Sequence, residues 1–200
     1  MEIIPLICLK KRKIVAEKEG DWLSINEALE QVDKDEKIYV LDIDGIEENK
    51  PNLCLYPKLS ENHKIWVDAG PRVLGDVVDS IMAGATNITV RKKIWSELDI
   101  SSIREITESE VYVDIGPKSQ DIQRIDFPLL HDINGLVLFN NKNQIETDFK
   151  YGSLLKNLCI KYKIYAYESN PKNFSYWKTL GVAGLLIDIR KSREFKKNEF

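Results

Sequence analysis

About eight short apolar runs recur along this chain, and polar sequence with helical periodicity follows most of them. β-branched and aromatic residues dominate the runs, which is typical of strands, and such continuous apolar character fits a parallel sheet covered by helices. The runs are Ile3–Leu9, Ile38–Ile43, Ile65–Ala69, Ile88–Val90, Val111–Ile115, Leu136–Phe139, Ile164–Tyr167 and Leu185–Ile189. Their spacing of roughly 20–25 residues predicts repeated strand–helix units and hence an α/β fold.

Capping residues and helical periodicity predict the helices between these runs. Ser24 and Glu27 form a capping-box pattern that opens a helix at Ala28–Val32. Ser101 or Ser102 is expected to cap another helix. The further helices are expected over Val73–Ala83, Ile103–Glu108, Gly152–Tyr162, Pro171–Leu180 with a stop at Gly181, and Lys191–Phe200, whereas Lys118–Asp132 is predicted to be a loop.

A closed barrel and an open doubly wound sheet both satisfy this alternation. An internal repeat favours the barrel, because Ile46 and Glu47 match Ile145 and Glu146 at a constant offset along which further Leu and Lys positions also match. Two half-barrels of about four units each would produce such a repeat, although similar elements can also match by chance. We predict one compact (β/α)8 barrel domain over residues 1–200, built from two half-barrel repeats. It must lack insertions, because an ordinary barrel of this kind takes roughly 250 residues.

Composition narrows the classes of partner. The net charge of -3 gives no basic excess for nucleic acid, and the basic stretch Lys10–Lys13 is interpreted as a solvated loop. No apolar stretch is long enough to span a membrane, and the first residues lack the basic region of a signal peptide. The cysteines Cys8, Cys54 and Cys159 are odd in number and widely spaced, which argues against zinc and disulfides and favours reduced thiols in a cytoplasm.

Three motifs occur in order along the first half of the chain. They are the opening IIPLICLKKRKIVAEKEGD, the run IYVLDIDGI and the stretch IWVDAGPRVLGDVVDSIMAGATNITV. In this order and spacing they resemble the HisA/HisF family of histidine biosynthesis, as a divergent, archaeal-type member of it. The resemblance implies a (β/α)8 barrel with its active site at the C-terminal ends of the strands.

The positions of that family's phosphate-binding loops are rewritten here. Where the family carries glycines, this chain has Asp68-Ala69-Gly70, Arg91-Lys92, Glu168-Ser169-Asn170 and Asp188-Ile189-Arg190. Glycine lets a backbone approach a phosphate closely, and a carboxylate beside a phosphate repels it. We therefore do not expect the histidine-pathway reaction.

The resemblance also points to a catalytic pair. The family's isomerases use acids at the ends of the first and fifth strands, where this chain has Cys8 and Asp114. A cysteine can act as acid, base or nucleophile, or it can be a small buried apolar residue. A carboxylate that ends an apolar strand is costly without a task. The catalytic candidates are Asp114, Cys8 and, on the third strand, Asp68.

Other polar residues lie at or just after strand ends and are candidates for binding substrate. They are Asp42, Asp44, Arg72, Lys92, Asn140, Glu168, Asp188 and Arg190. Such a ring of acids could hold a divalent cation such as Mg2+, although no cofactor or metal ligand set is assigned. It could equally perform acid–base chemistry with Asp114 as proton carrier, or form an inert network of ion pairs. Some of the carboxylates could instead cap the following helices.

Two functions follow from these residues. The first is an enzyme, an isomerase or lyase that acts on a small polar metabolite. The second is a non-catalytic binding or assembly barrel that has lost the ancestral activity. The expected partner is a small-molecule ligand, with a homodimer left open and neither nucleic acid nor membrane expected.

Overall fold

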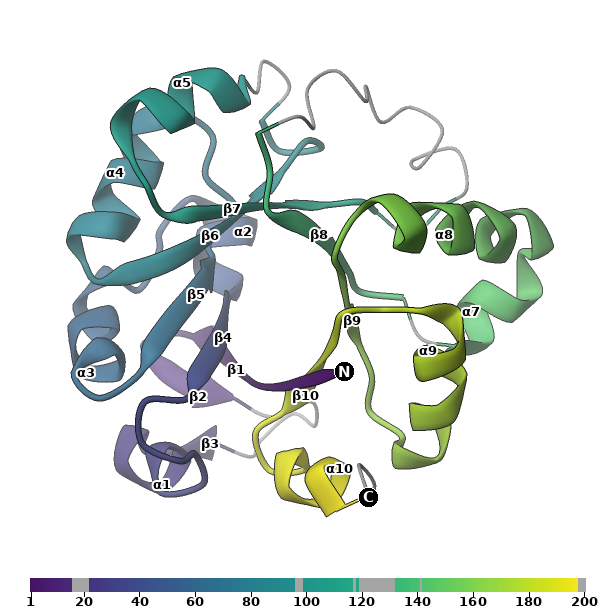
Figure 1. Ribbon diagram of the computed structural model, residues 1–200. Coiled ribbons are helices and arrows are strands. Elements are labelled where there is room, and N and C mark those ends of the chain that lie inside the picture. Colours follow the sequence, from purple (N-terminus) through teal and green to yellow (C-terminus); the bar gives the residue numbers. More distant parts are fainter. Residues whose placement is uncertain (16–21, 96–98, 117, 119–131, 141, 198–200) are drawn as a thin grey trace.

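The strands close into a ring. In the computed structural model, eight parallel strands pair in the order β1-β4-β5-β6-β7-β8-β9-β10, and β10 pairs back onto β1. Figure 1 shows this ring with the helices outside it. The structure describes residues 1–15, 22–95, 99–116, 118, 132–140 and 142–197. The protein is therefore a closed α/β barrel of TIM-like architecture, and the alternative of an open sheet was wrong.

The strands and helices have the following bounds. The strands are β1 Glu2–Lys10, β2 Lys13–Val15, β3 Trp22–Leu23, β4 Lys37–Asp42, β5 Lys64–Asp68, β6 Ala85–Arg91, β7 Glu110–Asp114, β8 Gly135–Leu138, β9 Ile164–Tyr167 and β10 Gly184–Asp188. The helices are α1 Ile25–Leu29, α2 Ile43–Glu48, α3 Tyr56–Ser60, α4 Leu74–Met82, α5 Ile100–Ile106, α7 Lys142–Thr147, α8 Phe149–Lys161, α9 Phe174–Leu180 and α10 Ser192–Lys197. Short 3-10 turns cover Leu53–Leu55 and Pro171–Asn173.

All eight predicted apolar runs overlap strands of the barrel. The capping box at α1 is confirmed, because Ser24 accepts a hydrogen bond from the Glu27 amide while the Glu27 carboxylate accepts one from Ser24. Gly181 ends α9 in the left-handed conformation, as predicted. The predicted loop Lys118–Asp132 falls almost entirely outside the described residues.

Three local features differ from the expectations or add to them. The cap of α5 is Asp99, whose carboxylate accepts hydrogen bonds from Ser101, so neither serine is the cap. The basic stretch Lys10–Lys13 is a solvated turn, as expected, and it belongs to a β1–β2 hairpin that β3 extends, which was not expected. Helix α2 begins directly after β4, where no helix was expected, because Asp42 caps it.

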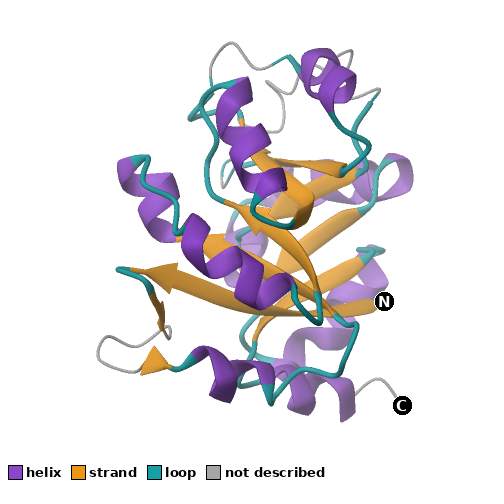
Figure 2. Ribbon diagram, turned by 90° about the vertical axis from the view of Figure 1, so that its left-hand side faces the viewer, coloured by secondary structure: helices purple, strands orange, loops and turns teal. Residues whose placement is uncertain are grey.

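Alternation along the strands divides the buried side chains into two cores. The larger core lies between the strands and the helices that flank them. Figure 2 shows these strands and helices from the side. The smaller core fills the barrel and is rich in aromatic rings. Its buried members are Ile4, Leu6, Tyr39, Trp66, Tyr112, Val137, Tyr165 and Leu186. The interior of the barrel is thus a packed core, as in other barrels of this size.

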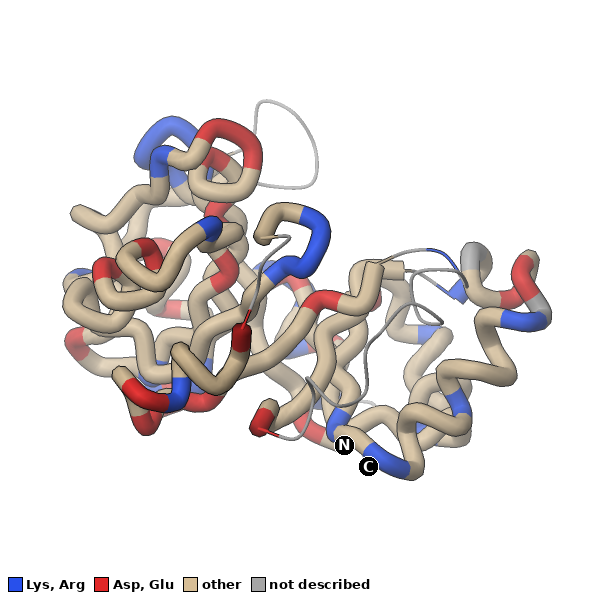
Figure 3. The backbone as a smooth tube through the Cα atoms, turned by 90° about the horizontal axis from the view of Figure 1, so that it is seen from above, with Lys and Arg blue, Asp and Glu red and all other residues tan. Residues whose placement is uncertain are grey.

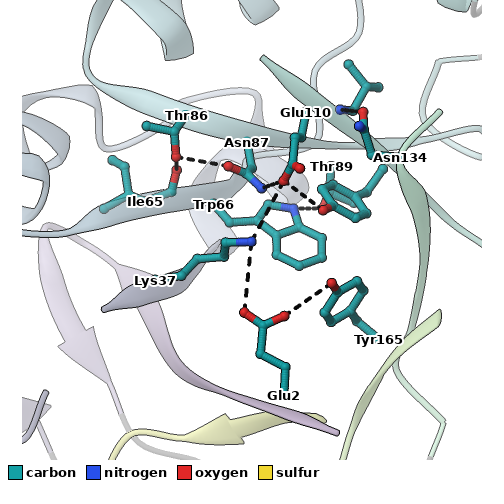
Figure 4. Close-up of polar contacts among 12 residues, drawn as sticks. Glu2, Lys37, Ile65, Trp66, Thr86, Asn87, Thr89, Glu110, Asn134 and Tyr165 are labelled. Atoms are coloured by element: carbon teal, nitrogen blue, oxygen red, sulfur yellow. Dashed lines mark hydrogen bonds and ion pairs between the residues drawn. The ribbon is translucent and has the colours of Figure 1, made fainter. Parts of the chain in front are cut away.

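A group of polar side chains lies at the N-terminal ends of the strands (Figure 4). The Lys37 ammonium lies 4.0 Å from the Glu2 carboxylate and 3.7 Å from that of Glu110. The hydroxyl groups of Tyr165 and Tyr112 donate to these same two carboxylates at 3.2 and 2.9 Å. The carboxylates of this end are therefore engaged in holding the barrel together.

Two further expectations concern the whole chain. All three cysteines are free thiols. Within the described part of the chain, no helix is both long and apolar enough to cross a membrane.

Candidate functional site

Three charged side chains meet at the C-terminal ends of adjacent strands. Asp68, Arg91 and Asp114 are the last residues of β5, β6 and β7. Each follows an inward-facing residue by two positions, so each side chain turns toward the barrel axis. The chemistry of barrels of this type is located at this end.

Arg91 joins the two carboxylates. Its Nε lies 2.9 Å from Oδ1 of Asp68 and its Nη2 lies 2.6 Å from Oδ2, a bidentate pair. Its Nη1 lies 3.3 Å from Oδ2 of Asp114. The side chain of Asp68 is fully buried, whereas 11% of the Asp114 side chain and 17% of Arg91 are exposed. Asp114 is thus the carboxylate of the group that solvent or a ligand can reach.

A chain of hydrogen bonds continues from Asp68 into the aromatic core. The Trp66 indole nitrogen lies 2.8 Å from Oγ1 of Thr89, which lies 3.2 Å from the Tyr39 hydroxyl. That hydroxyl lies 2.8 Å from Oδ2 of Asp68. Because an indole can only donate and a carboxylate can only accept, every hydrogen bond in the chain is donated in the same direction, from Trp66 toward Asp68. The chain fixes the orientation of the Asp68 carboxyl group.

The surroundings shift the pKa values of Asp114 and Arg91 in the same direction. Burial raises the pKa of Asp114, the Asp68 charge adds to this rise, and the Arg91 guanidinium opposes it. Burial by itself would lower the pKa of Arg91, but the carboxylates of Asp68 and Asp114 outweigh it and hold that pKa above its ordinary value. Arg91 is therefore a permanent cation, and Asp114 is the group whose protonation can change.

The inward-facing neighbours of this group are a thiol, an aliphatic side chain and two aromatic rings. Cys8 and Leu41 are partly buried members of the barrel core, as are Phe139 and Tyr167. The last two rings stack with centroids 6.1 Å apart, and the Arg91 guanidinium lies 5.3 Å from the Phe139 centroid. The C-terminal end of the barrel thus combines Asp114 with apolar and aromatic surfaces.

Asp42 lies on the opposite face of its strand. It follows the inward-facing Leu41 by one residue and is fully buried between the sheet and the helices. It accepts hydrogen bonds from the Gly45 amide, from the amide and side chain of Asn52, and from the Tyr56 hydroxyl. These four bonds employ its carboxylate in capping α2 and anchoring the segment that follows.

Asp44 and Arg72 lie beside the same helix. The Asp44 carboxylate accepts hydrogen bonds from the Lys11 amide and the Asn52 side chain. The Arg72 guanidinium donates to the carbonyl groups of Gly45 and Ile46. Both side chains thus contact residues in or near α2, and the structure does not bring them to Asp114.

Gly70 is the one glycine that remains in the rewritten loop after β5. Its φ is +61°, and a Cβ atom there would lie 3.0 Å from the Ile46 Cα. The glycine therefore allows α2 to pack closely against this loop, which accounts for it without a bound anion.

Glu168 also points toward the helices. It follows the inward-facing Tyr167 by one residue and is 1% exposed. Its carboxylate accepts hydrogen bonds from the amides of Ser169 and Asn170 and from the side chains of Asn173 and Trp177. These contacts fix the turn that leads into α9, and they do not bring Glu168 to Asp68 and Asp114.

The remaining candidates are distributed around the rim. Asp188 is buried at the inward-facing end of β10, where it accepts from the Arg190 amide and lies 3.9 Å from the Arg190 guanidinium. Asn140 is buried just after β8, and Lys92 is exposed just after β6. The carboxylate contacts of Asp188 in this structure are therefore with Arg190.

Tyr39 and Thr89 are part of the group although no motif indicates them. Both lie in apolar strand sequence, where a tyrosine or threonine is typical of any strand. Arg91 was noted as a loop substitution, but the binding role was assigned to Lys92. Alternation is the signal that could have found Thr89 and Arg91, because they lie two positions apart, as Trp66 and Asp68 do.

No three side chains of His, Cys, Asp or Glu come together as metal ligands among the described residues. The oxygen atoms of Asp68 and Asp114 meet a guanidinium in this structure. The arrangement fits a permanent internal cation, so the geometry gives no support to a dedicated Mg2+ set.

No protein-family model matches the chain, and no curated protein matches it either. The barrel architecture is therefore established by strand pairing, and no comparison establishes a family.

Proposed function

We propose that this barrel is a HisA-related enzyme that transfers a proton on a small polar metabolite, as an isomerase or lyase, with Asp114 as the proton carrier. One observation carries the proposal. A partly exposed acid at the C-terminal rim contacts a guanidinium that a second, fully buried carboxylate holds in place.

A proton carrier needs two accessible protonation states near the working pH. Burial and the Asp68 charge favour the protonated form of Asp114, while Arg91 favours the ionised form. The net effect of these opposing influences is a raised pKa of Asp114, which is the direction that a general base near neutral pH requires. Asp68 and Tyr39 then act as positioning residues for Arg91.

Cys8 is the candidate for a second proton-transfer group. Its strand, β1, lies four places from β7 in the eight-strand ring, so Cys8 and Asp114 stand on opposite sides of the barrel. A ligand bound between them would be accessible to one group on each face, as an isomerisation with separate acid and base requires. The kinship with HisA and the half-barrel duplication also belong to this proposal, and they are supported by the three motifs and by the repeat of Ile46 at Ile145.

A ligand screen followed by isotope exchange tests the proposal. Ligands from a metabolite panel are first identified by the rise in melting temperature that binding to the folded state produces. Each ligand is then incubated with the protein in D2O, and incorporation of deuterium at carbon is followed by NMR. We expect exchange with the wild type, loss of exchange with Asp114→Asn, and retention of the ligand-induced thermal shift. Asp79→Asn, at an exposed carboxylate of α4, is the matched control and should exchange normally.

A non-catalytic binding barrel is the second candidate. The observation that favours it is the complete engagement of Asp42 and Glu168 in structural hydrogen bonds, together with the pairing of Arg91. It predicts that ligands bind without any isotope exchange and that Asp114→Asn changes only stability. That combination would contradict the catalytic proposal.

A further inference from the structure

The turn between β1 and β2 is an unusual place for two basic residues. Lys10 pairs with Lys13 across the hairpin, which leaves Lys11 and Arg12 as the two central turn residues. Their φ angles are +50° and +60°, the left-handed values of a type I′ turn. Such turns strongly prefer Asn-Gly, because a bulky side chain is strained in this region.

The charge of this turn is also unusual. In the view of Figure 3, acidic and basic residues are interspersed along most of the chain. The turn departs from this mixture with four successive basic residues, Lys10–Lys13. Lys10 pairs with Glu47 and Lys13 lies over the Trp22 ring, but no acidic side chain pairs with Lys11 or Arg12 among the described residues. Both of these side chains are exposed.

The backbone of the turn is nevertheless firmly anchored. The Lys11 amide donates to the Asp44 carboxylate at 2.5 Å, and the Arg12 amide donates to Oδ1 of Asn52 at 3.0 Å. Asn52 is itself 5% exposed and is held by Asp42 at 2.6 and 2.8 Å. A strained turn that is fixed by Asp44 and the buried Asn52 presents its two cationic side chains from a preorganised position.

We propose that Lys11 and Arg12 form a binding site for an oxyanion, the phosphate or carboxylate group of a small ligand. A guanidinium offers paired donors that match either group, and an adjacent ammonium adds a point charge. The turn follows Cys8 on β1, so the site lies at the same end of the barrel as Asp114. This assignment does not depend on any catalytic role of Asp114.

Two turn variants separate the anion site from the backbone strain. Lys11→Gln/Arg12→Gln removes both charges and keeps two non-glycine residues in the turn. Lys11→Asn/Arg12→Gly removes the charges and also installs the preferred type I′ sequence. We expect the first variant to melt within about 2 °C of the wild type and the second to melt roughly 4–8 °C higher. Both should bind pyrophosphate about tenfold more weakly or worse, measured by calorimetry and by amide NMR shifts at low salt.

Lys156→Gln/Lys178→Gln, which removes two exposed charges on α8 and α9, is the matched control, and it should retain pyrophosphate and citrate binding. An equal loss in this control would assign the binding to general surface charge and overturn the proposal. Unchanged binding in both turn variants would do the same. So would an unchanged melting temperature in Lys11→Asn/Arg12→Gly, because the turn would then carry no strain. Binding of a single-stranded oligonucleotide without binding of either small anion would replace the proposed ligand by nucleic acid.

Discussion

Replacing Arg91 by methionine removes the cation between two carboxylates. The methionine keeps an unbranched side chain, but Asp68 stays fully buried and, among the described residues, keeps the Tyr39 hydroxyl as its one hydrogen-bond donor. Breaking a buried pair by removing one partner typically costs about 3–5 kcal/mol, because the other charge stays buried without compensation. Since a chain of this length shifts its melting temperature by about 2–4 °C per kcal/mol, Arg91→Met should melt roughly 10 °C lower.

Urea unfolding is the assay for this prediction. The indoles of Trp66 and Trp177 are fully buried, so their fluorescence should report loss of both cores. The free energy of unfolding should fall by about 3–5 kcal/mol at pH 7 without a change in m-value. Asp68→Asn/Arg91→Met removes both buried charges and should recover most of this loss.

The loss should also depend on pH. Without Arg91, the raised pKa of Asp114 rises further, because the guanidinium that opposes the rise is gone. An acid with a folded-state pKa above its unfolded value loses stability as pH rises through that interval, so the deficit of Arg91→Met should be smaller near pH 4 than at pH 7. A deficit below about 1 kcal/mol at pH 7 would refute the reasoning. A double variant as unstable as Arg91→Met would refute it as well.

Three more changes test the structural assignments. Asp114→Asn should match the stability of the wild type below about pH 4 and become more stable than the wild type as pH rises, because burial raises the pKa of Asp114 in the folded state. Thermal melts across pH check this, and a higher stability of the variant already at low pH would contradict it. Glu168→Gln places an amide against groups that donate to the carboxylate, and should cost about 2–3 kcal/mol in urea unfolding; a neutral result would show that the turn before α9 does not need the charge. Gly184→Ala should cost about 1–3 kcal/mol, because the added Cβ would lie 2.8 Å from the Tyr165 ring, whereas Gly75→Ala has no neighbour within 4 Å and should stabilise α4.

The barrel could be predicted because its eight strands are short apolar runs and its connections contain helix signals. Closure itself depends on the pairing of β10 with β1, which no local pattern specifies. The β1–β2 hairpin could not be found, because Lys11 and Arg12 oppose the residue preference of the turn that they form. The conformation depends instead on Asp44 and Asn52, which are distant in sequence.

The candidate site could be located only in part. Asp42 and Asp68 both end parallel strands, yet Asp42 faces the helices and Asp68 faces the barrel axis. A strand shows both of its faces as apolar when helices cover one and an aromatic core fills the other. The sequence therefore reveals that an acid ends a strand, but not to which side the acid points.

Once it is known to which side each acid points, the acids divide into those that stabilise the fold and those that do not. Asp42 and Glu168 each accept hydrogen bonds from several groups of their own local segments, so a carboxylate there stabilises the fold. Asp114 has its pKa raised by burial, so its ionisation works against folding, and the strained turn at Lys11 and Arg12 does likewise. Natural chains tend to retain such unfavourable features where function needs them. The two features lie at the same end of one barrel, and this coincidence directs the search for a ligand to the C-terminal ends of the strands.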